Sequence, residues 1–232
     1  MRGGGASGGN STGSGAGTRP AAGASTRRWR LLAWLRWTTV AVLLSLLLLD
    51  QCFPLPLPQD GDTATVVVAA DGTPLRAFAD AQGVWRHRTD PAQVSPLYLQ
   101  ALLTYEDRHF HRHPGVNPWA LLRAGWQWAT QGRIISGGST LTMQVARLLQ
   151  PDTRSLAGKL RQLLRALQLE AHLDKQQILT LYLERAPYGG TIEGVQAASW
   201  AYLGKPASAL SHAEAALLAV LPAVLYFTGI YI

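Results

Sequence analysis

The pattern of hydrophobic positions begins with one long apolar run. Residues 1–30 start as a Gly-, Ser-, Ala- and Thr-rich stretch without apolar periodicity and end in several arginines, so we predict a disordered cytoplasmic tail there. Residues 31–49 are almost continuously apolar, with a single charge at Arg36. A helix of that length spans about 28 Å, enough to cross the core of a bilayer. We therefore predict a transmembrane anchor over residues 31–52, followed by a Pro-rich extended linker over residues 53–62.

The charges on the two sides of the apolar run indicate its orientation. Arginines precede it, whereas Asp50, Asp60 and Asp62 follow it. The positive-inside rule then places the N-terminus in the cytoplasm and the rest of the chain outside. The alternative is a cleaved signal peptide, which the following residues "DQCFPLP" disfavour because they offer no small-residue cleavage site.

Beyond the linker the pattern predicts one β-hairpin and then helices. A β-branched run, an Asp71-Gly72 turn and a second short run predict a hairpin between Thr63 and Phe78. From Ser95, a plausible N-cap, apolar residues recur at helical spacing. Because no later strand is comparably marked, the predicted fold class is mainly α. The expected helices lie at about 96–110, 118–131, 140–150, 156–172 and 175–185, the last with a capping box of Asp174 and Gln177.

Two of these helices carry informative faces. The helix of "SGGSTLTMQVARLLQP" is expected to use Ser139 as its N-cap and to stop before Pro151. Its polar face holds Thr140, Gln144 and Arg147, beside an apolar face of Leu141, Val145 and Leu148. The next helix is expected to turn one row of leucines inward: Leu156, Leu160, Leu163, Leu164 and Leu167. A second row on it consists of Lys159, Gln162, Ala166 and Glu170.

Composition narrows the classes of function. The chain of 232 residues has 47% hydrophobic and 15% charged residues, with a net charge of +7 and an isoelectric point near 10.0. That balance suits nucleic acid, an anionic membrane surface or a phosphate-bearing substrate. A single cysteine, Cys52, excludes an internal disulfide framework and a zinc site built from several cysteines.

The stretch "YEDRHFHRHPG" at 105–115 gathers titratable groups, and three interpretations compete. Its histidines, at positions 109, 111 and 113, could bind a metal, but spacing of two residues on a helix does not converge well. Its acids could carry acid/base chemistry. A solvated helix end is the simplest alternative, although it does not account for the phenylalanine and the "HPG" turn beside the acids.

Several motifs in a fixed order carry a family resemblance. "EDRHFHRHPGVN" is followed by "GGSTLTMQVARLL" and then by "GKLRQLLRALQLEAHLDKQQILTLYLERAPYGGTIEGVQAASWAYLGK". Together they resemble glycosyltransferase family 51, the peptidoglycan glycosyltransferase domain of class A penicillin-binding proteins, and most of all its 1C branch. The similarity covers roughly residues 64–222.

The resemblance implies a lysozyme-like helical domain outside the bacterial cytoplasmic membrane. Such domains polymerise lipid II into β-1,4-linked glycan and release undecaprenyl pyrophosphate. Glu106 matches the family's general base, which takes a proton from the attacking 4-hydroxyl. The reaction inverts configuration, so it requires no covalent nucleophile. Arg133, Arg147 and Lys159 match positions that contact the pyrophosphate, where positive charge stabilises the developing anion.

The resemblance also implies the rest of the site and its partners. Asp107 lies where the family often places a metal-associated acid, with a hydrogen-bonding role as the alternative, so a divalent cation such as Mg²⁺ is the one cofactor considered. The expected partners are lipid II, the growing glycan strand, the bilayer and other cell wall synthesis proteins, and not nucleic acid. The remaining residues expected to bind substrate are Asp107, Phe110, His113, Gly115, Gly138, Ser139, Thr140, Thr142, Gln144 and Gln162.

Three departures from the family pattern affect these expectations. The "RKxxE"-like motif reads "GKLRQ", so Gln162 stands for the usual second acid, and Glu170 is a weak candidate for a supporting one. The family's "YLN" reads "YLE", with Glu184. The family's "LPQAPS" becomes "LPAVLYFTGIYI", so we expect an incomplete domain over 63–222, an aberrant tail after it and no transpeptidase domain. The alternatives are an inactive membrane-bound remnant or scaffold and a lysozyme-like lytic enzyme.

Overall fold

The computed structural model describes residues 23–58, 63–70, 74–132, 138–151 and 155–227. The chain divides into two compact units, residues 1–53 and 54–232. Within its described residues, the first unit is helix α1 (Gly23–Cys52). This helix begins eight residues before the predicted start of the anchor, so residues 23–30 are helical rather than disordered. Its segment Ala33–Cys52 is long and apolar enough to cross a membrane, judged by length and composition.

The predicted hairpin opens the second unit. Strands β1 (Thr65–Val68) and β2 (Pro74–Phe78) pair antiparallel, with Thr65 opposite Phe78. The predicted turn at 71–72 lies outside the described residues.

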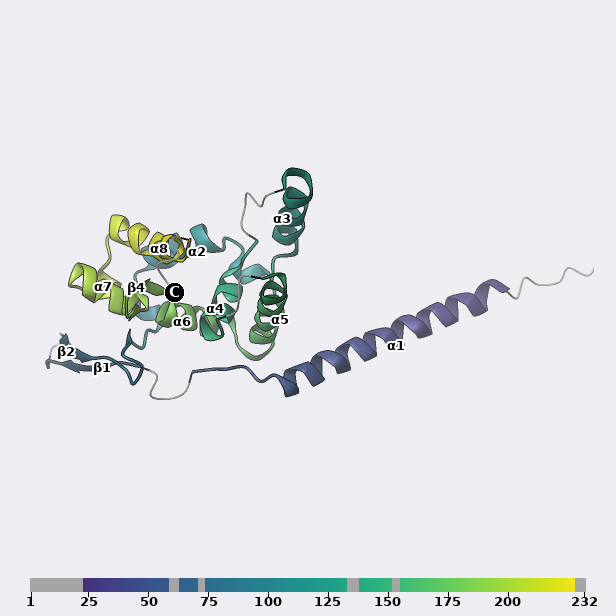
Figure 1. Cartoon of the computed structure of the whole chain (residues 1–232), viewed down its shortest axis with the longest axis horizontal. Helices are drawn as coiled ribbons and strands as arrows, with labels where there is room; N and C mark the ends of the chain where they lie inside the picture. Colours follow the sequence, from purple (N-terminus) through teal and green to yellow (C-terminus); the bar gives the residue numbers. More distant parts are fainter. Residues whose placement is uncertain (1–22, 59–62, 71–73, 133–137, 152–154, 228–232) are drawn as a thin grey trace, which may run out of the picture. The chain divides into compact units, whose positions relative to one another are not determined.

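The rest of the second unit is mainly α, as predicted (Figure 1). The predicted helix bounds are confirmed to within a few residues, and the capping box of Asp174 and Gln177 is present. The last helix continues five residues past Pro222, into the segment that was expected to be an aberrant tail. The helices are α2 (Pro96–Glu106), α3 (Pro118–Gln131), α4 (Leu141–Leu149), α5 (Leu156–His172), α6 (Lys175–Arg185), α7 (Val195–Leu203) and α8 (His212–Phe227), with short 3-10 turns η1 (Pro91–Gln93), η2 (Phe110–Arg112) and η3 (Ala207–Ala209).

A small second sheet was not expected from the sequence. It has the order β3 (Trp85–Arg86), β5 (Ile192–Glu193), β4 (Pro187–Gly189). The buried guanidinium of Arg86 holds it together through ion pairs with Asp80 at 3.3 Å and Glu193 at 2.7 Å. Strands of two or three residues leave too little periodicity for a sequence pattern to reveal.

One continuous core joins α2, α4, α5, α6, α7 and α8. Helix α2 packs along α8, and α4 packs against α5 and α6. The inward row of α2 is Tyr98 and Leu102, both fully buried, and Glu106 follows at the same four-residue spacing. The carboxylate at the end of this row is therefore held by the core rather than by a loop.

The predicted orientation of α5 is wrong. Leu156 is 90% exposed and Leu160 is 59% exposed, whereas Ala166 and Leu169 are buried. Small residues on the inward row let α5 approach its neighbours closely: a Cβ at Gly115 would lie 2.7 Å from the carbonyl oxygen of Ala166. The row of small and polar residues therefore faces inward, and most of the leucine row faces outward.

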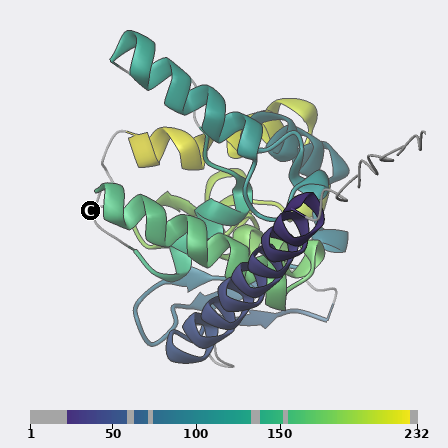
Figure 2. The same cartoon turned by 90° about the vertical axis from the view of Figure 1, so that its right-hand side faces the viewer.

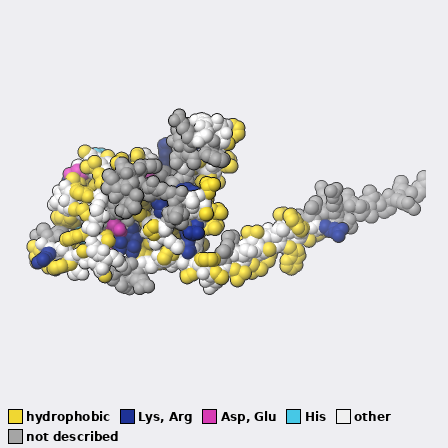
Figure 3. Space-filling view, viewed as in Figure 1, with side chains coloured by type: hydrophobic (Ala, Val, Ile, Leu, Met, Phe, Trp, Pro, Cys, Tyr) yellow, Lys and Arg dark blue, Asp and Glu magenta, His cyan; other side chains and the backbone are white. Residues whose placement is uncertain are grey.

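Helix α3 adds a second exposed apolar face. It stands apart from the other helices in both ribbon views (Figures 1 and 2). Trp119, Leu122 and Trp126, at helical spacing, are 79%, 65% and 72% exposed. Hydrophobic side chains accordingly cover the outer sides of α3 and α5, and Lys and Arg lie beside those of α5 (Figure 3). Large exposed apolar faces of this kind mark interaction surfaces.

Candidate active site

Glu106 is the last residue of α2, and its carboxylate is half-buried. Its Oε2 accepts a hydrogen bond of 2.6 Å from Nε2 of Gln144 on α4. Its Oε1 is buried and has no hydrogen-bond partner among the described residues. Burial raises the pKa of the Glu106 carboxyl, although the bond from Gln144 and the charge of Arg147 oppose the rise. Burial therefore has a larger effect on this pKa than the basic neighbour has.

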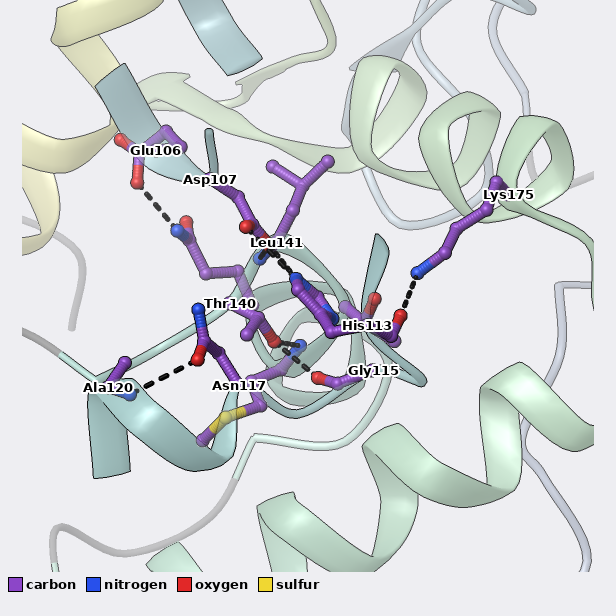
Figure 4. Close-up of polar contacts among 12 residues, drawn as sticks. Glu106, Asp107, His113, Gly115, Asn117, Ala120, Thr140, Leu141 and Lys175 are labelled. Carbon is purple, nitrogen blue, oxygen red and sulfur yellow. Dashed lines mark hydrogen bonds and ion pairs between the residues drawn. The ribbon is translucent and has the colours of Figure 1, made fainter. Parts of the chain in front are cut away.

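Asp107 has a different role from its neighbour. Both of its oxygens lie 3.0 Å from Nε2 of His113, and one also accepts the backbone N–H of Leu141 at 2.9 Å. The pair is buried. Figure 4 shows Asp107 and His113 facing each other beside Leu141, with Glu106 directed away from them. The carboxylate thus fastens the start of α4 to the turn after α2.

The metal role expected for Asp107 stays a prediction. No group of three or more His, Cys, Asp or Glu side chains that could hold a metal lies within the described part of the chain. The carboxylate of Asp107 is engaged by an imidazole and a backbone amide. His109 and His111 are exposed, so the three histidines of the motif do not share a site.

The turn after Asp107 is fixed by packing and by a special backbone conformation. Phe110 is fully buried in the core. Gly115 has a φ of +76°, which a residue with a side chain rarely adopts, and it lies against α5. The hydroxyl of Thr140 donates to the carbonyl oxygen of Gly115. The motif "EDRHFHRHPG" is therefore a built element of the site, not a solvated helix end.

The N-cap of α4 is Thr140, not the predicted Ser139. The Thr140 hydroxyl oxygen accepts the backbone N–H of Met143 at 3.2 Å. Ser139 contributes a buried hydroxyl that makes no hydrogen bond within the described ranges. Gly138 lies against the backbone of α3. Thr142 is buried, and its hydroxyl donates to Glu170 at 2.7 Å.

Positive charge gathers where α4 and α5 meet. Partial desolvation lowers the pKa of Lys159, and the nearby charge of Arg147 lowers it further, so these two cations lie close together. The ammonium of Lys159 also donates to Oε1 of Gln162 at 3.0 Å. The amide nitrogen of Gln162 in turn donates to the carbonyl of Met143 on α4. Arg133, the third predicted cation, lies outside the described residues.

Glu170, the candidate supporting acid, and Glu184, which departs from the family pattern, both have partners. Oε1 of Glu170 accepts from Lys175 at 2.6 Å as well as from Thr142, so it is bound in a network and is not placed to act as a supporting acid. Oε1 of Glu184 accepts the backbone N–H of Thr89 at 3.0 Å.

Lys175 is the residue of this region that the sequence reasoning missed. It is the first residue of α6, where a cation opposes the helix dipole. That local conflict is the one sequence signal that could have suggested a tertiary role.

The arrangement combines a partly desolvated carboxylate with the nearby charge of Arg147, and Arg147 in turn acts on Lys159. A carboxylate oxygen that has no hydrogen-bond partner can accept a proton from a hydroxyl. Arg147 and Lys159 can stabilise negative charge that develops on a leaving group. These groups are of the kinds that a transfer reaction with an anionic leaving group would use.

Comparisons with known proteins identify the family. The family model described as Transglycosylase matches residues 71–224, and the chain belongs to this family. Penicillin-binding protein 1C of Escherichia coli (strain K12) is 60% identical over 191 residues, which are 80% of this chain and 25% of that protein. Penicillin-binding protein 1A of Pseudomonas aeruginosa is 36% identical over 216 residues, again 25% of that protein. The chain thus spans about a quarter of the length of these two relatives.

A shorter relative carries an activity in its name. The biosynthetic peptidoglycan transglycosylase of Burkholderia pseudomallei (strain K96243) is 39% identical over 145 residues, which are 61% of this chain and 57% of that protein. The resemblance to family 51 and to its 1C branch is therefore confirmed. Fold class and family agree with a lysozyme-like helical domain.

Proposed function

We propose that the chain is a peptidoglycan glycosyltransferase that polymerises lipid II into β-1,4-linked glycan strands for cell wall synthesis. The observation that carries the proposal is the geometry of Glu106: one carboxylate oxygen accepts from Gln144, and the other is buried without a hydrogen-bond partner among the described residues. The charge of Arg147 acts on this carboxyl, and Arg147 in turn acts on Lys159. The family and the names of the relatives support the same activity.

The chemistry follows from these groups. Glu106 accepts the proton of a sugar 4-hydroxyl while the oxygen of that hydroxyl bonds to the anomeric carbon of the donor. The bond from that carbon to the lipid pyrophosphate breaks, and its electron pair leaves with the phosphate oxygen. Arg147 and Lys159 stabilise the anion that forms, in contacts of the kind that contribute about 1.5–3 kcal/mol each. One displacement inverts the anomeric centre.

The basic pair is more useful for this reaction than for hydrolysis of finished glycan. A lytic enzyme protonates a sugar oxygen as leaving group and has no pyrophosphate to neutralise. The charge of Arg147 lowers the pKa of Lys159, so the proximity of the two cations costs energy. An anionic ligand between them would offset that repulsion.

The exposed apolar faces of α3 and α5 support a location at the surface of a bilayer. α1 has the length and composition of a membrane span. The outer faces of α3 and α5 expose tryptophans and leucines, of which Trp119 and Leu156 are the most exposed. Aromatic side chains and basic residues are typical of membrane interfaces. We infer a single-pass protein of the bacterial cytoplasmic membrane with its N-terminus in the cytoplasm and its catalytic domain on the outer side, where the lipid-linked substrate is held.

Purified full-length chain and fluorescent lipid II in detergent micelles test this function. The expected product is a ladder of glycan polymers, with release of undecaprenyl pyrophosphate and β-linkages that muramidase cleaves. In a parallel reaction, finished glycan strands should remain uncut. Cleavage of those strands without polymerisation would assign a lytic enzyme, and inertness toward both substrates would assign a remnant.

A further inference from the structure

Lys175 makes three contacts that no simple helix-end lysine needs. Its ammonium donates to Oε1 of Glu170 at 2.6 Å and to the carbonyl oxygen of His113 at 2.8 Å. It also lies 4.5 Å from the centre of the Phe110 ring, within cation–π range. The side chain is 23% exposed and that of Glu170 is 10% exposed. An ion pair that is largely removed from water costs desolvation energy, and a cation at the N-terminus of a helix also opposes the helix dipole. Lys175 must therefore do something that offsets these costs.

The carbonyl that Lys175 binds belongs to the residue that pairs with Asp107. The ring of His113 bonds Asp107, and Asp107 bonds the first amide of α4 at Leu141. Figure 4 shows Lys175 reaching the backbone of His113 from the side of the turn opposite to Glu106. Lys175 therefore fixes the far end of a chain of contacts whose near end adjoins Glu106.

The same turn is fastened a second time to α4. Thr140, the N-cap of α4, donates to the carbonyl of Gly115, two residues after His113. Gln144 lies one turn further along α4 and holds the carboxylate of Glu106. Any displacement of the turn is transmitted to the start of α4 and thereby to the bond between Gln144 and Glu106.

We propose that Lys175 is a positioning residue for the proposed glycosyl transfer: it holds the turn at His113 so that Asp107 and α4 keep Gln144 bonded to Glu106. This inference rests on the proposed function. Lys175 does not touch the reacting groups, and its second partner, Glu170, supplies a competing explanation in which the lysine only neutralises a buried charge.

Two variants separate positioning from neutralisation. Lys175→Met removes both hydrogen bonds and leaves the charge of Glu170 without a cation, so it is expected to lower both stability and activity. Lys175→Met combined with Glu170→Gln removes the unpaired charge, while an amide oxygen still accepts the hydroxyl of Thr142. Lys205→Met is the matched control, because Lys205 pairs with Glu214 at 2.6 Å, outside the site.

The experiment measures thermal unfolding, hydrogen–deuterium exchange of residues 107–115 and lipid II turnover across pH for these variants and for Glu170→Gln alone. We expect the double variant to regain most of the thermal stability but to turn over lipid II at least tenfold more slowly than Glu170→Gln. The acid limb of the variant's pH–rate profile should move to higher pH, because Glu106 loses the bond from Gln144 that lowers the pKa of the Glu106 carboxyl. Amides in the turn should exchange at least tenfold faster than in Glu170→Gln, and Lys205→Met should match the wild type.

Recovery of turnover and of the wild-type acid limb in the double variant would overturn the proposal, leaving Lys175 as a neutralising charge. Unchanged exchange in the turn would overturn it equally. A wild-type chain without lipid II turnover would refute the proposed function instead, and the exchange measurement would still decide whether Lys175 fixes the turn.

Discussion

Replacing Gln144 with leucine probes the environment of the proposed base directly. The change keeps side-chain size but deletes the amide that donates to Glu106 at 2.6 Å. A hydrogen bond to a charged group contributes about 1.5–3 kcal/mol, and each pKa unit corresponds to about 1.36 kcal/mol. Full loss would therefore raise the pKa of Glu106 by about one to two units. Because the carboxylate is only half-buried, water replaces part of the bond, and we expect a rise of about one unit.

The sign of the effect on activity follows from the role of the carboxylate. A base works only when ionised, so the rate falls as the pH drops through its pKa. Burial has already raised the pKa of Glu106. Gln144→Leu should move the acid limb of kcat/KM for lipid II to higher pH by about one unit, so the loss of activity should be greatest in acid and smallest in base.

The assay is continuous lipid II turnover at constant ionic strength across the pH range in which the protein stays folded. Gln176→Leu on α6 is the matched control, because Gln176 is exposed and lies outside the site. It should leave both the rate and the acid limb unchanged. A uniformly slower Gln144→Leu enzyme with the wild-type acid limb would refute the idea that this bond tunes the base.

Two further changes test other parts of the site. Arg147→Ala should cut lipid II turnover at least tenfold with little loss of thermal stability, because a charge-assisted contact to pyrophosphate contributes about 1.5–3 kcal/mol. Arg76→Ala on the hairpin is the control. Equal rates for the two variants would show that positive charge serves only general attraction. Gly115→Ala should lower both the melting temperature and turnover, since its Cβ would lie 2.7 Å from the carbonyl of Ala166 at a φ of +76°. Gly204→Ala has a similar φ of +66° and open space around it, so it measures the backbone strain alone, and equal losses of stability in the two glycine variants would disprove the close packing.

The parts of the fold that depend on local chemistry were predictable from the sequence. The capping box of Asp174 and Gln177 and the break before Pro151 involve residues within one helical turn, and both are present. The sequence pattern predicts Ser139 as the N-cap of α4 in place of Thr140, because the hydroxyl of either residue can cap a helix. The choice depends on tertiary contact, because Thr140 also reaches the carbonyl of Gly115.

The inward face of α5 could not be predicted from amphipathicity. Its leucine row has the spacing of a core face, yet Leu156 is 90% exposed. The pattern shows that a helix has two faces, but not whether the apolar one meets protein or another apolar medium. The inward face is set by close approach at Ala166 and by polar contacts of Gln162 and Glu170, which only the fold brings together.

In the candidate site, too, some features could be predicted from the sequence and others depend on the fold. Glu106, Asp107 and His113 lie in one short motif, so family resemblance pointed to them together. Resemblance did not show that Asp107 is bound to an imidazole and a backbone amide. Lys175 lies 62 residues from the His113 carbonyl that it binds, and no local pattern links the two.

The most direct test of the account compares lipid II polymerisation by the wild-type chain and by Glu106→Gln. Glutamine keeps the shape and the bond from Gln144 but cannot accept a proton at working pH. Burial raises the pKa of Glu106, so the ionised carboxylate lowers the stability of the folded wild type at neutral pH, and that cost is relieved as the pH falls through the raised pKa. The variant should therefore be at least as stable as the wild type at neutral pH, yet form no glycan polymer. A folded Glu106→Gln chain that polymerises lipid II at a near-normal rate would contradict the assignment of Glu106 as the general base.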